Sequence, residues 1–169
     1  MFDVLAAVVS GGSIKFVDFV EDEKKGKNLL KWPMAIIAGL AFGYVLSFSP
    51  ASSMFLAILA AQVFMGKVDR VAHGLAVVLA VLTAFLYGIG PLDIQLLVAF
   101  FILSTIDEIP LEGVLAPLGE YRLWLKGGAL CVGLITSVWS YFILIMAFDM
   151  AYLTVAYYLG EGIRPMRQK

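Results

Sequence analysis

A short charged segment in the middle of the chain carries the residues best suited to chemistry. Its four ionisable side chains are Lys67, Asp69, Arg70 and His73. Residues 51–64 before it and residues 74–90 after it carry no charge. Asp69 and His73 are four positions apart, so they share one face if the segment is helical. Charged side chains beside membrane segments are costly unless they are solvated, paired or bound to a ligand, and the segment therefore indicates a functional site.

A second acidic pair, Asp107 and Glu108, ends another apolar stretch just before Pro110, which stops a helix. If these carboxylates meet Asp69 and His73, the group offers oxygen and imidazole ligands. Such ligands suit magnesium, manganese or zinc. The sequence thus predicts a divalent-metal site, with Mg²⁺ or Mn²⁺ as the expected ion.

Lys67 and Arg70 would lie beside this metal, where basic side chains hold phosphate oxygens in phosphoryl chemistry. A purely structural alternative stands beside this interpretation. In it, Lys67, Asp69 and Arg70 form an ion-paired cap at the membrane surface, and His73 hydrogen-bonds to a nearby carbonyl.

One carboxylate differs from the rest, because Asp149 is the only charge in residues 127–159. A buried carboxylate there is costly, so it is either a proton or cation relay or the acceptor of a hydrogen bond, for example from Tyr152. Asp18 and Asp22, four positions apart, form a secondary candidate pair of ligands.

The composition explains why these charges stand out. Of the 169 residues, 62% are hydrophobic and 15% are charged, and the mean hydropathy is +0.94. These values lie outside the range of soluble globular domains and predict an integral membrane protein with one domain over residues 1–169. The net charge of −1 makes nucleic acid an improbable partner. The single cysteine, Cys131, excludes an internal disulfide.

The elements that must position these residues are apolar helices. We expect an all-α, polytopic bundle within residues 33–160, and the predicted spans cover residues 33–48, 51–66, 74–90, 92–107 and 127–159. The first four have uncharged segments of only about 15 to 17 residues, or roughly 22 to 26 Å of helix, against a hydrocarbon core of about 30 Å. Polar groups at their ends are therefore drawn towards the membrane.

The remaining segments are predicted to lie at the membrane surface. Residues 1–32 read as an N-terminal segment, with an interfacial or re-entrant helix that Gly11-Gly12 ends and an aqueous stretch after it. Residues 111–126 suit an interfacial loop, and residues 161–169 form a polar tail. The last apolar stretch exceeds one span, so it is one long helix or a span followed by an interfacial or re-entrant helix.

Five spans place nearly all lysines and arginines on one face, which the positive-inside rule makes cytoplasmic. The basic tail then lies outside, unless a re-entrant or sixth span after Ser137 returns it. Gly39 and Gly43 form a GxxxG pattern, which predicts close helix packing and a homo-oligomer through this face.

These observations lead to three hypotheses of function for a multi-pass protein of a prokaryotic cell membrane. The first is a divalent-metal-dependent enzyme acting on a phosphate-bearing lipid or isoprenoid at the cytoplasmic interface. The second is a transporter or channel for a cation or small solute, with Asp149 and Asp107 on the pathway. The third is a non-catalytic membrane subunit. The sequence contains no HExxH, GxSxG, Walker or CxxC motif, so the enzyme classes that need them are excluded.

Overall fold

The computed structural model describes residues 1–23, 29–110 and 115–160, and within these ranges the chain is helical, without strands. The helices are α1 (Phe2–Glu23), α2 (Lys31–Phe48), α3 (Ser52–Phe64), α4 (Val71–Tyr87), α5 (Ile94–Asp107), α6 (Ala116–Glu120), α7 (Leu123–Thr136) and α8 (Ser140–Tyr158). The all-α prediction is confirmed. The tail predicted for residues 161–169 lies outside the described residues.

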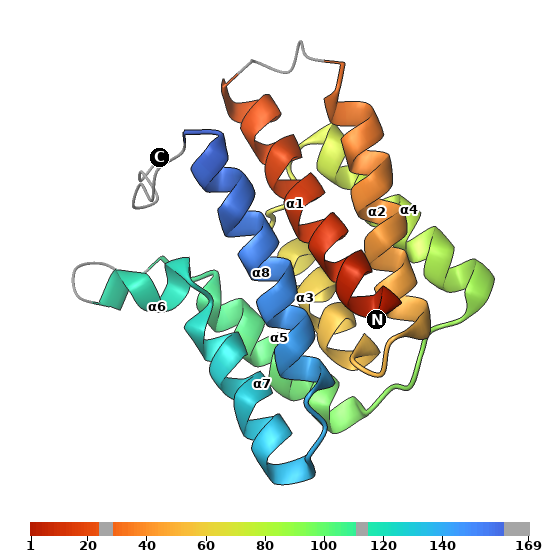
Figure 1. Ribbon diagram of the computed structural model, residues 1–169, viewed down its shortest axis with the longest axis vertical. Coiled ribbons are helices and arrows are strands. Elements are labelled where there is room, and N and C mark those ends of the chain that lie inside the picture. Colours follow the sequence, from red (N-terminus) through yellow and green to blue (C-terminus); the bar gives the residue numbers. More distant parts are fainter. Residues whose placement is uncertain (24–28, 111–114, 161–169) are drawn as a thin grey trace.

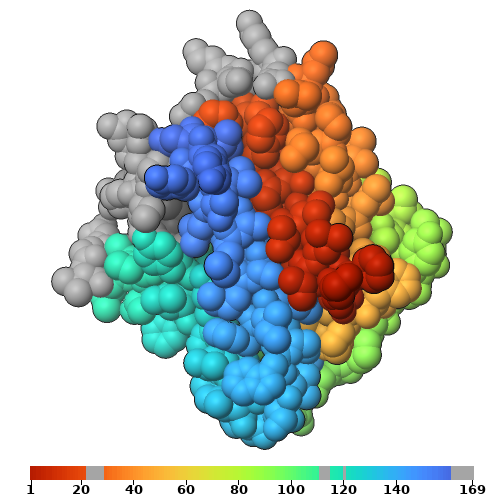
Figure 2. Space-filling model, viewed as in Figure 1, coloured from red at the N-terminus to blue at the C-terminus, as the bar shows by residue number. Residues whose placement is uncertain are grey.

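The helices form two layers (Figure 1). One layer runs α8–α1–α2–α4 and the other runs α7–α5–α3, because these are the neighbours that pack most extensively. Figure 2 shows α1 lying between α8 and α2 on the viewed face. Two apolar clusters fill the space between neighbours. The larger one is centred on aromatic rings, with Phe42, Phe55 and Phe148 in mutual edge contacts at 5.4–6.3 Å between ring centroids.

The two layers differ in helix length. In the first, α8, α1, α2 and α4 have 19, 22, 18 and 17 residues, whereas α7, α5 and α3 in the second have 14, 14 and 13. At 1.5 Å per residue, the second layer is about 20 Å thick and the first about 26 to 33 Å. The short layer therefore ends part of the way up the flank of the long one, and we call this level the step.

Glycine lets the long layer pack closely. A Cβ on Gly11 would overlap the backbone carbonyl of Phe148, so only glycine allows α1 to approach α8 this closely. The prediction that Gly11-Gly12 ends a short N-terminal helix is therefore wrong. α1 continues through both glycines as far as Glu23, so the first half of the aqueous stretch predicted for residues 11–32 is instead a packed helix with Val17 and Val20 fully buried. Residues 24–28 of that stretch lie outside the described residues.

Gly39 and Gly43 have the same role between α2 and α4. A Cβ on either would press against Ala76, Leu79, Ala80 or Thr83 of α4. The buried residues of α4 are all alanines, spaced four apart: Ala72, Ala76, Ala80 and Ala84. The close packing predicted from GxxxG thus occurs within one chain. α4 covers the Gly39/Gly43 face within the chain, and a homo-oligomer stays a prediction.

The end of the chain also differs from five simple spans. Residues 127–159 break into two antiparallel helices at Ser137, whose φ of 62° places it in the left-handed region. The single-helix alternative is therefore wrong, and the alternative with a further helix after Ser137 describes the chain. Residues 115–126, expected to be loop, contain α6 and the start of α7.

Two helices in the described chain, Lys31–Phe48 and Ser140–Tyr158, are long and apolar enough to cross a membrane. Four more are apolar but shorter: Ser52–Phe64, Val71–Tyr87, Ile94–Asp107 and Leu123–Thr136. Length and composition thus give weak support for membrane association, and they do not establish the five spans expected.

The glycine contact generates a test. Gly11→Ala should destabilise the protein by about 1–3 kcal/mol, because the added methyl group overlaps the α8 backbone. Gly74→Ala is the matched control, since a Cβ at this helical position meets nothing within 4 Å. It should stabilise by up to about 1 kcal/mol. Thermal unfolding of both variants in detergent measures the difference, and equal stability would contradict the packing described.

Candidate functional site

Charged side chains gather at one end of the bundle, on and above the step. The basic residues that the structure describes are Lys15, Lys31, Lys67, Arg70, Arg122 and Lys126, and all belong to this half. The turns at the other end, residues 49–51, 88–93 and 137–139, contain no lysine or arginine. We call the end that carries these basic residues the charged end. Alternating helix direction produces this arrangement, as the sequence predicts.

The centre of the charged end is Asp149, which is 6% exposed in the middle of α8. Lys126 Nζ lies 2.8 Å from Asp149 Oδ2, and Arg122 Nη1 lies 3.6 Å from Asp149 Oδ1. Both cations come from the first turn of α7 or the residue before it, at the level of the step. The buried carboxylate is thus neutralised by two groups from the adjacent helix.

Arg122 also reaches α5 and α8. Its Nη2 lies 3.8 Å from Glu108 Oε1, and its guanidinium lies over the Tyr152 ring, 5.8 Å from the centroid. Burial alone would lower the pKa of Arg122. The charges of Asp149 and Glu108 outweigh that effect and raise the pKa of Arg122 above its ordinary value.

The backbone of Arg122 is strained to make these contacts. Its φ of 49° and ψ of 47° are left-handed, a conformation that costs a non-glycine residue roughly 1–2 kcal/mol. Strain of this kind persists where the surrounding structure imposes it. Here the ion pairs on both sides of Arg122 supply that constraint.

Glu108 gathers further partners at the end of α5. Lys67 Nζ lies 3.4 Å from Glu108 Oε2, and Gln62 Nε2 donates a hydrogen bond to Glu108 Oε1. Glu108 therefore joins the ends of α3 and α5 to Arg122 before α7.

Asp107, next to it, is 3% exposed and has a different task. The backbone N–H of Trp124 donates to Oδ1 at 3.1 Å, and that of Leu125 donates to Oδ2 at 2.8 Å. A carboxylate at this place satisfies free N–H groups of the first turn and opposes the positive end of the helix dipole. Both oxygens of Asp107 are thereby used to cap α7 from the end of α5.

A second polar group lies on the flank of the long layer. His73 Nε2 lies 2.6 Å from Asp18 Oδ1, and Tyr152 Oη donates to Asp18 Oδ2 at 2.8 Å. These contacts join α4, α1 and α8. A carboxylate on one ring nitrogen fixes the orientation of a histidine. His73 Nδ1 has no hydrogen-bond partner among the residues that the structure describes.

The structure does not bring the predicted metal ligands together. His73 pairs with Asp18, Asp107 caps α7, and Glu108 pairs with Lys67 and Arg122. Asp69 has a side chain 65% exposed and lies 3.7 Å from Arg70 Nε. Among the described residues, no three His, Cys, Asp or Glu form a group that could hold a metal ion. The secondary candidate Asp18 is engaged as above, and the side chain of Asp22 lies outside the described residues.

Two cations at the charged end remain accessible. The side chains of Lys67 and Arg70 are 42% and 45% exposed, and each has one ion-pair contact, at 3.4 and 3.7 Å respectively. Lys126, by contrast, is 13% exposed and held by Asp149. The exposed side chains of Lys67 and Arg70 can attract an anion to the loop between α3 and α4.

Sequence reasoning missed the partners of these carboxylates. Arg122 and Lys126 were counted only as surface charges of a loop, although they follow Asp107 and Glu108 on the same side of the bundle. The Asp18–Tyr152 bond needed α1 to be a helix beside α8, and Gly11 and Gly12 are the residues in the sequence that indicate such packing.

Comparison of this chain with protein-family models, with curated protein sequences and with solved structures gave no match.

The Asp149 cluster generates a prediction of stability. Asp149→Asn leaves Lys126 buried without a counter-charge, so it should destabilise the protein by about 3–5 kcal/mol. Asp69→Asn removes the same charge from an exposed side chain and should change stability by at most about 0.5 kcal/mol. Reversible unfolding in detergent compares the two. Similar losses in both variants would mean that the buried cluster does not hold the charged end together.

Proposed function

We propose that this is a multi-pass membrane protein that binds a phosphate-bearing lipid or isoprenoid at the charged end of its bundle. The observation that carries the proposal is the pair of accessible cations, Lys67 and Arg70, next to an otherwise apolar surface. A lipid headgroup lies at this junction of charged and apolar surface.

Exposed apolar side chains support the membrane part of the proposal. They lie on the outer faces of both layers, for example Val78, Phe85, Ile102, Ile135 and Met150, each at least 51% exposed. Contiguous apolar surface on this scale is typical of a membrane-facing protein. The clustering of basic residues at one end makes that end cytoplasmic under the positive-inside rule.

The short layer brings the charged end close to lipid. Its helices, about 20 Å long, are shorter than a hydrocarbon core of about 30 Å, so the bilayer thins or the polar groups at the step are drawn inward. A headgroup phosphate would then meet the loop between α3 and α4. Arg70 suits it because a guanidinium binds two phosphate oxygens at once. Its exposed pair with Asp69 is worth about 0–1 kcal/mol, so a phosphate can replace it.

A dependence on magnesium or manganese stays a prediction within this proposal. Mg²⁺ is commonly held by one or two carboxylates together with substrate phosphate, and Asp69 is exposed beside the proposed phosphate position. The cation-transport hypothesis is less well supported. Its central residue, Asp149, already has two cationic partners, so an incoming cation would have to displace Lys126 and Arg122.

The orientation is tested with single cysteines in a Cys131→Ser background. Asp69→Cys lies in the loop between α3 and α4, and Ile89→Cys lies at the other end of the bundle. A membrane-impermeant maleimide should label Ile89→Cys in intact cells and Asp69→Cys only after the membrane is opened. Labelling of both from the same side would contradict the proposed topology.

Headgroup binding is tested by native mass spectrometry of the protein with phosphatidic acid or with diacylglycerol, which has the same chains and no phosphate. Arg70→Gln should weaken the binding of phosphatidic acid about tenfold, since a charge-assisted hydrogen bond is worth about 1.5–3 kcal/mol. Asp69→Asn is the matched control when divalent cations are removed, and under that condition it should bind at least as well as the unchanged protein, because it removes a competing negative charge. Equal binding of the two lipids would overturn the proposal.

A further inference from the structure

The two layers meet through α2 and α3, and beyond that contact they close on each other at one edge only. At that edge α7 and α8 are consecutive and packed together. At the other edge α3 packs on α5 and α4 packs on α2, while α3 and α4 hardly touch each other. An apolar groove of about 450 Å³ lies along this edge, and we call it the seam. It is lined by Leu56, Leu59, Ala60, Val63 and Phe64 of α3, Val77 and Val81 of α4, and Phe101 of α5.

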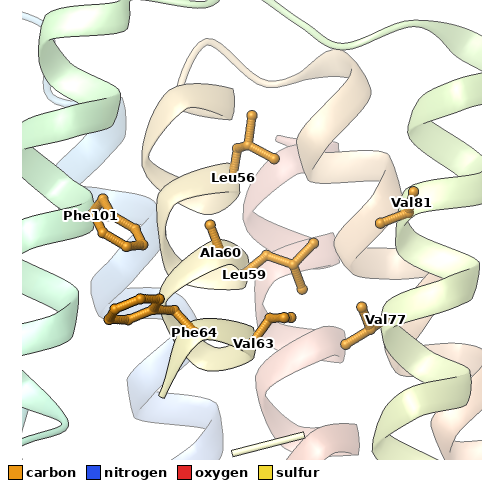
Figure 3. Close-up of a pocket in the computed structure, with 8 residues that line it drawn as sticks. All are labelled: Leu56, Leu59, Ala60, Val63, Phe64, Val77, Val81 and Phe101. Carbon is orange, nitrogen blue, oxygen red and sulfur yellow. The ribbon is translucent and has the colours of Figure 1, made fainter. Parts of the chain in front are cut away.

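The lining of the seam is entirely hydrocarbon. Figure 3 shows Leu59 and Val63 pointing from α3 towards Val77 and Val81 on α4. From Leu56 to Phe64 the groove follows α3 for about 12 Å. The groove is shallow and open to the surroundings along its length.

The two walls of the seam are joined at the charged end by one loop, residues 65–70, which contains both Lys67 and Arg70. The backbone N–H of Lys67 donates to the Gln62 carbonyl at 2.9 Å, so Lys67 is folded back onto the end of α3. Arg70 directly precedes α4, and Val77 and Val81 follow it at helical positions on one face. The loop that carries both cations therefore lies beyond the charged end of the groove, next to Phe64 in the chain and about two helical turns from Val77.

We propose that the seam holds the hydrocarbon chain of an anionic lipid, while Lys67 and Arg70 hold its phosphate. This proposal rests on the proposed function and adds to it the place and chemistry of the bound chain. Charge complementarity selects the occupant: one ligand must be apolar over at least the length of the groove and negatively charged at the end next to the loop. A phosphate-bearing acyl or isoprenyl lipid has both properties.

Photocrosslinking in nanodiscs tests the proposal. The probe is phosphatidic acid with a diazirine in one acyl chain, at a low fraction in phosphatidylcholine, and the crosslinked residues are mapped by mass spectrometry. We expect crosslinks to concentrate on residues of the seam, Leu59, Val63, Val77 and Val81 among them. Ala60→Phe, which puts a ring into the groove, should reduce these crosslinks at least fivefold. Ala99→Phe, on an exposed position of α5 outside the groove, is the matched control and should leave them unchanged.

The variants separate failure of the seam from failure of the proposed function. Crosslinks spread evenly over the outer faces of α5, α7 and α8 would show only surrounding bilayer lipid and overturn the seam. So would an Ala60→Phe protein with undiminished crosslinks, even if Arg70→Gln still weakened the binding of phosphatidic acid. A seam that stays free of lipid crosslinks in a protein whose native mass is that of a dimer, while Ala60→Phe restores the monomer, would assign the seam to a dimer instead. Crosslinks confined to the seam but equally strong with a phosphatidylcholine probe would contradict headgroup recognition by Lys67 and Arg70.

Discussion

The interaction of Asp149 with Lys126 and Arg122 is the constraint on which the charged end depends. A carboxylate in the middle of an apolar helix needs a counter-charge at the same depth, and α7 provides two because it begins at that depth. The start of α7 is in turn fixed by Asp107, whose oxygens accept the N–H groups of Trp124 and Leu125. Charge pairing and helix capping therefore set the level of the step together.

Close packing of small residues holds the helices of the long layer together in its apolar part. Gly11 brings α1 against the backbone of α8, and Gly39 and Gly43 bring α2 against the alanines of α4. These contacts place Asp18, His73 and the Tyr152 hydroxyl within hydrogen-bonding distance, although they are far apart in the sequence. The polar contacts of the long layer thus depend on glycine and alanine, whose small size lets the helices approach closely.

Much of this fold could be predicted from composition and from the positions of charges. The limits of α2, α3, α4 and α5 lie within a few residues of the predicted spans, because charged residues, proline and glycine mark where apolar helices end. Alternating helix direction then predicts that Asp107, Glu108, Arg122 and Lys126 share one end. The pairs of helices that pack together could not be predicted. The GxxxG spacing shows that Gly39 and Gly43 need a close neighbouring helix, but it does not show which helix that is. The Asp107 carboxylate was assigned to a metal for the same reason: an acidic helix end can bind an ion or cap another helix, and only the position of α7 decides between them.

The loop of residues 65–70 joins the α3 and α4 walls of the seam at the charged end. Lys67 ties it to Glu108 in the short layer, and Arg70 leads directly into α4 of the long layer. α3 and α4 share almost no contact surface, and the two layers meet beside the seam through α2 and α3 instead. An anion that contacts both Lys67 and Arg70 would therefore bridge the end of α3 and the start of α4 at a place where their side chains do not pack on each other.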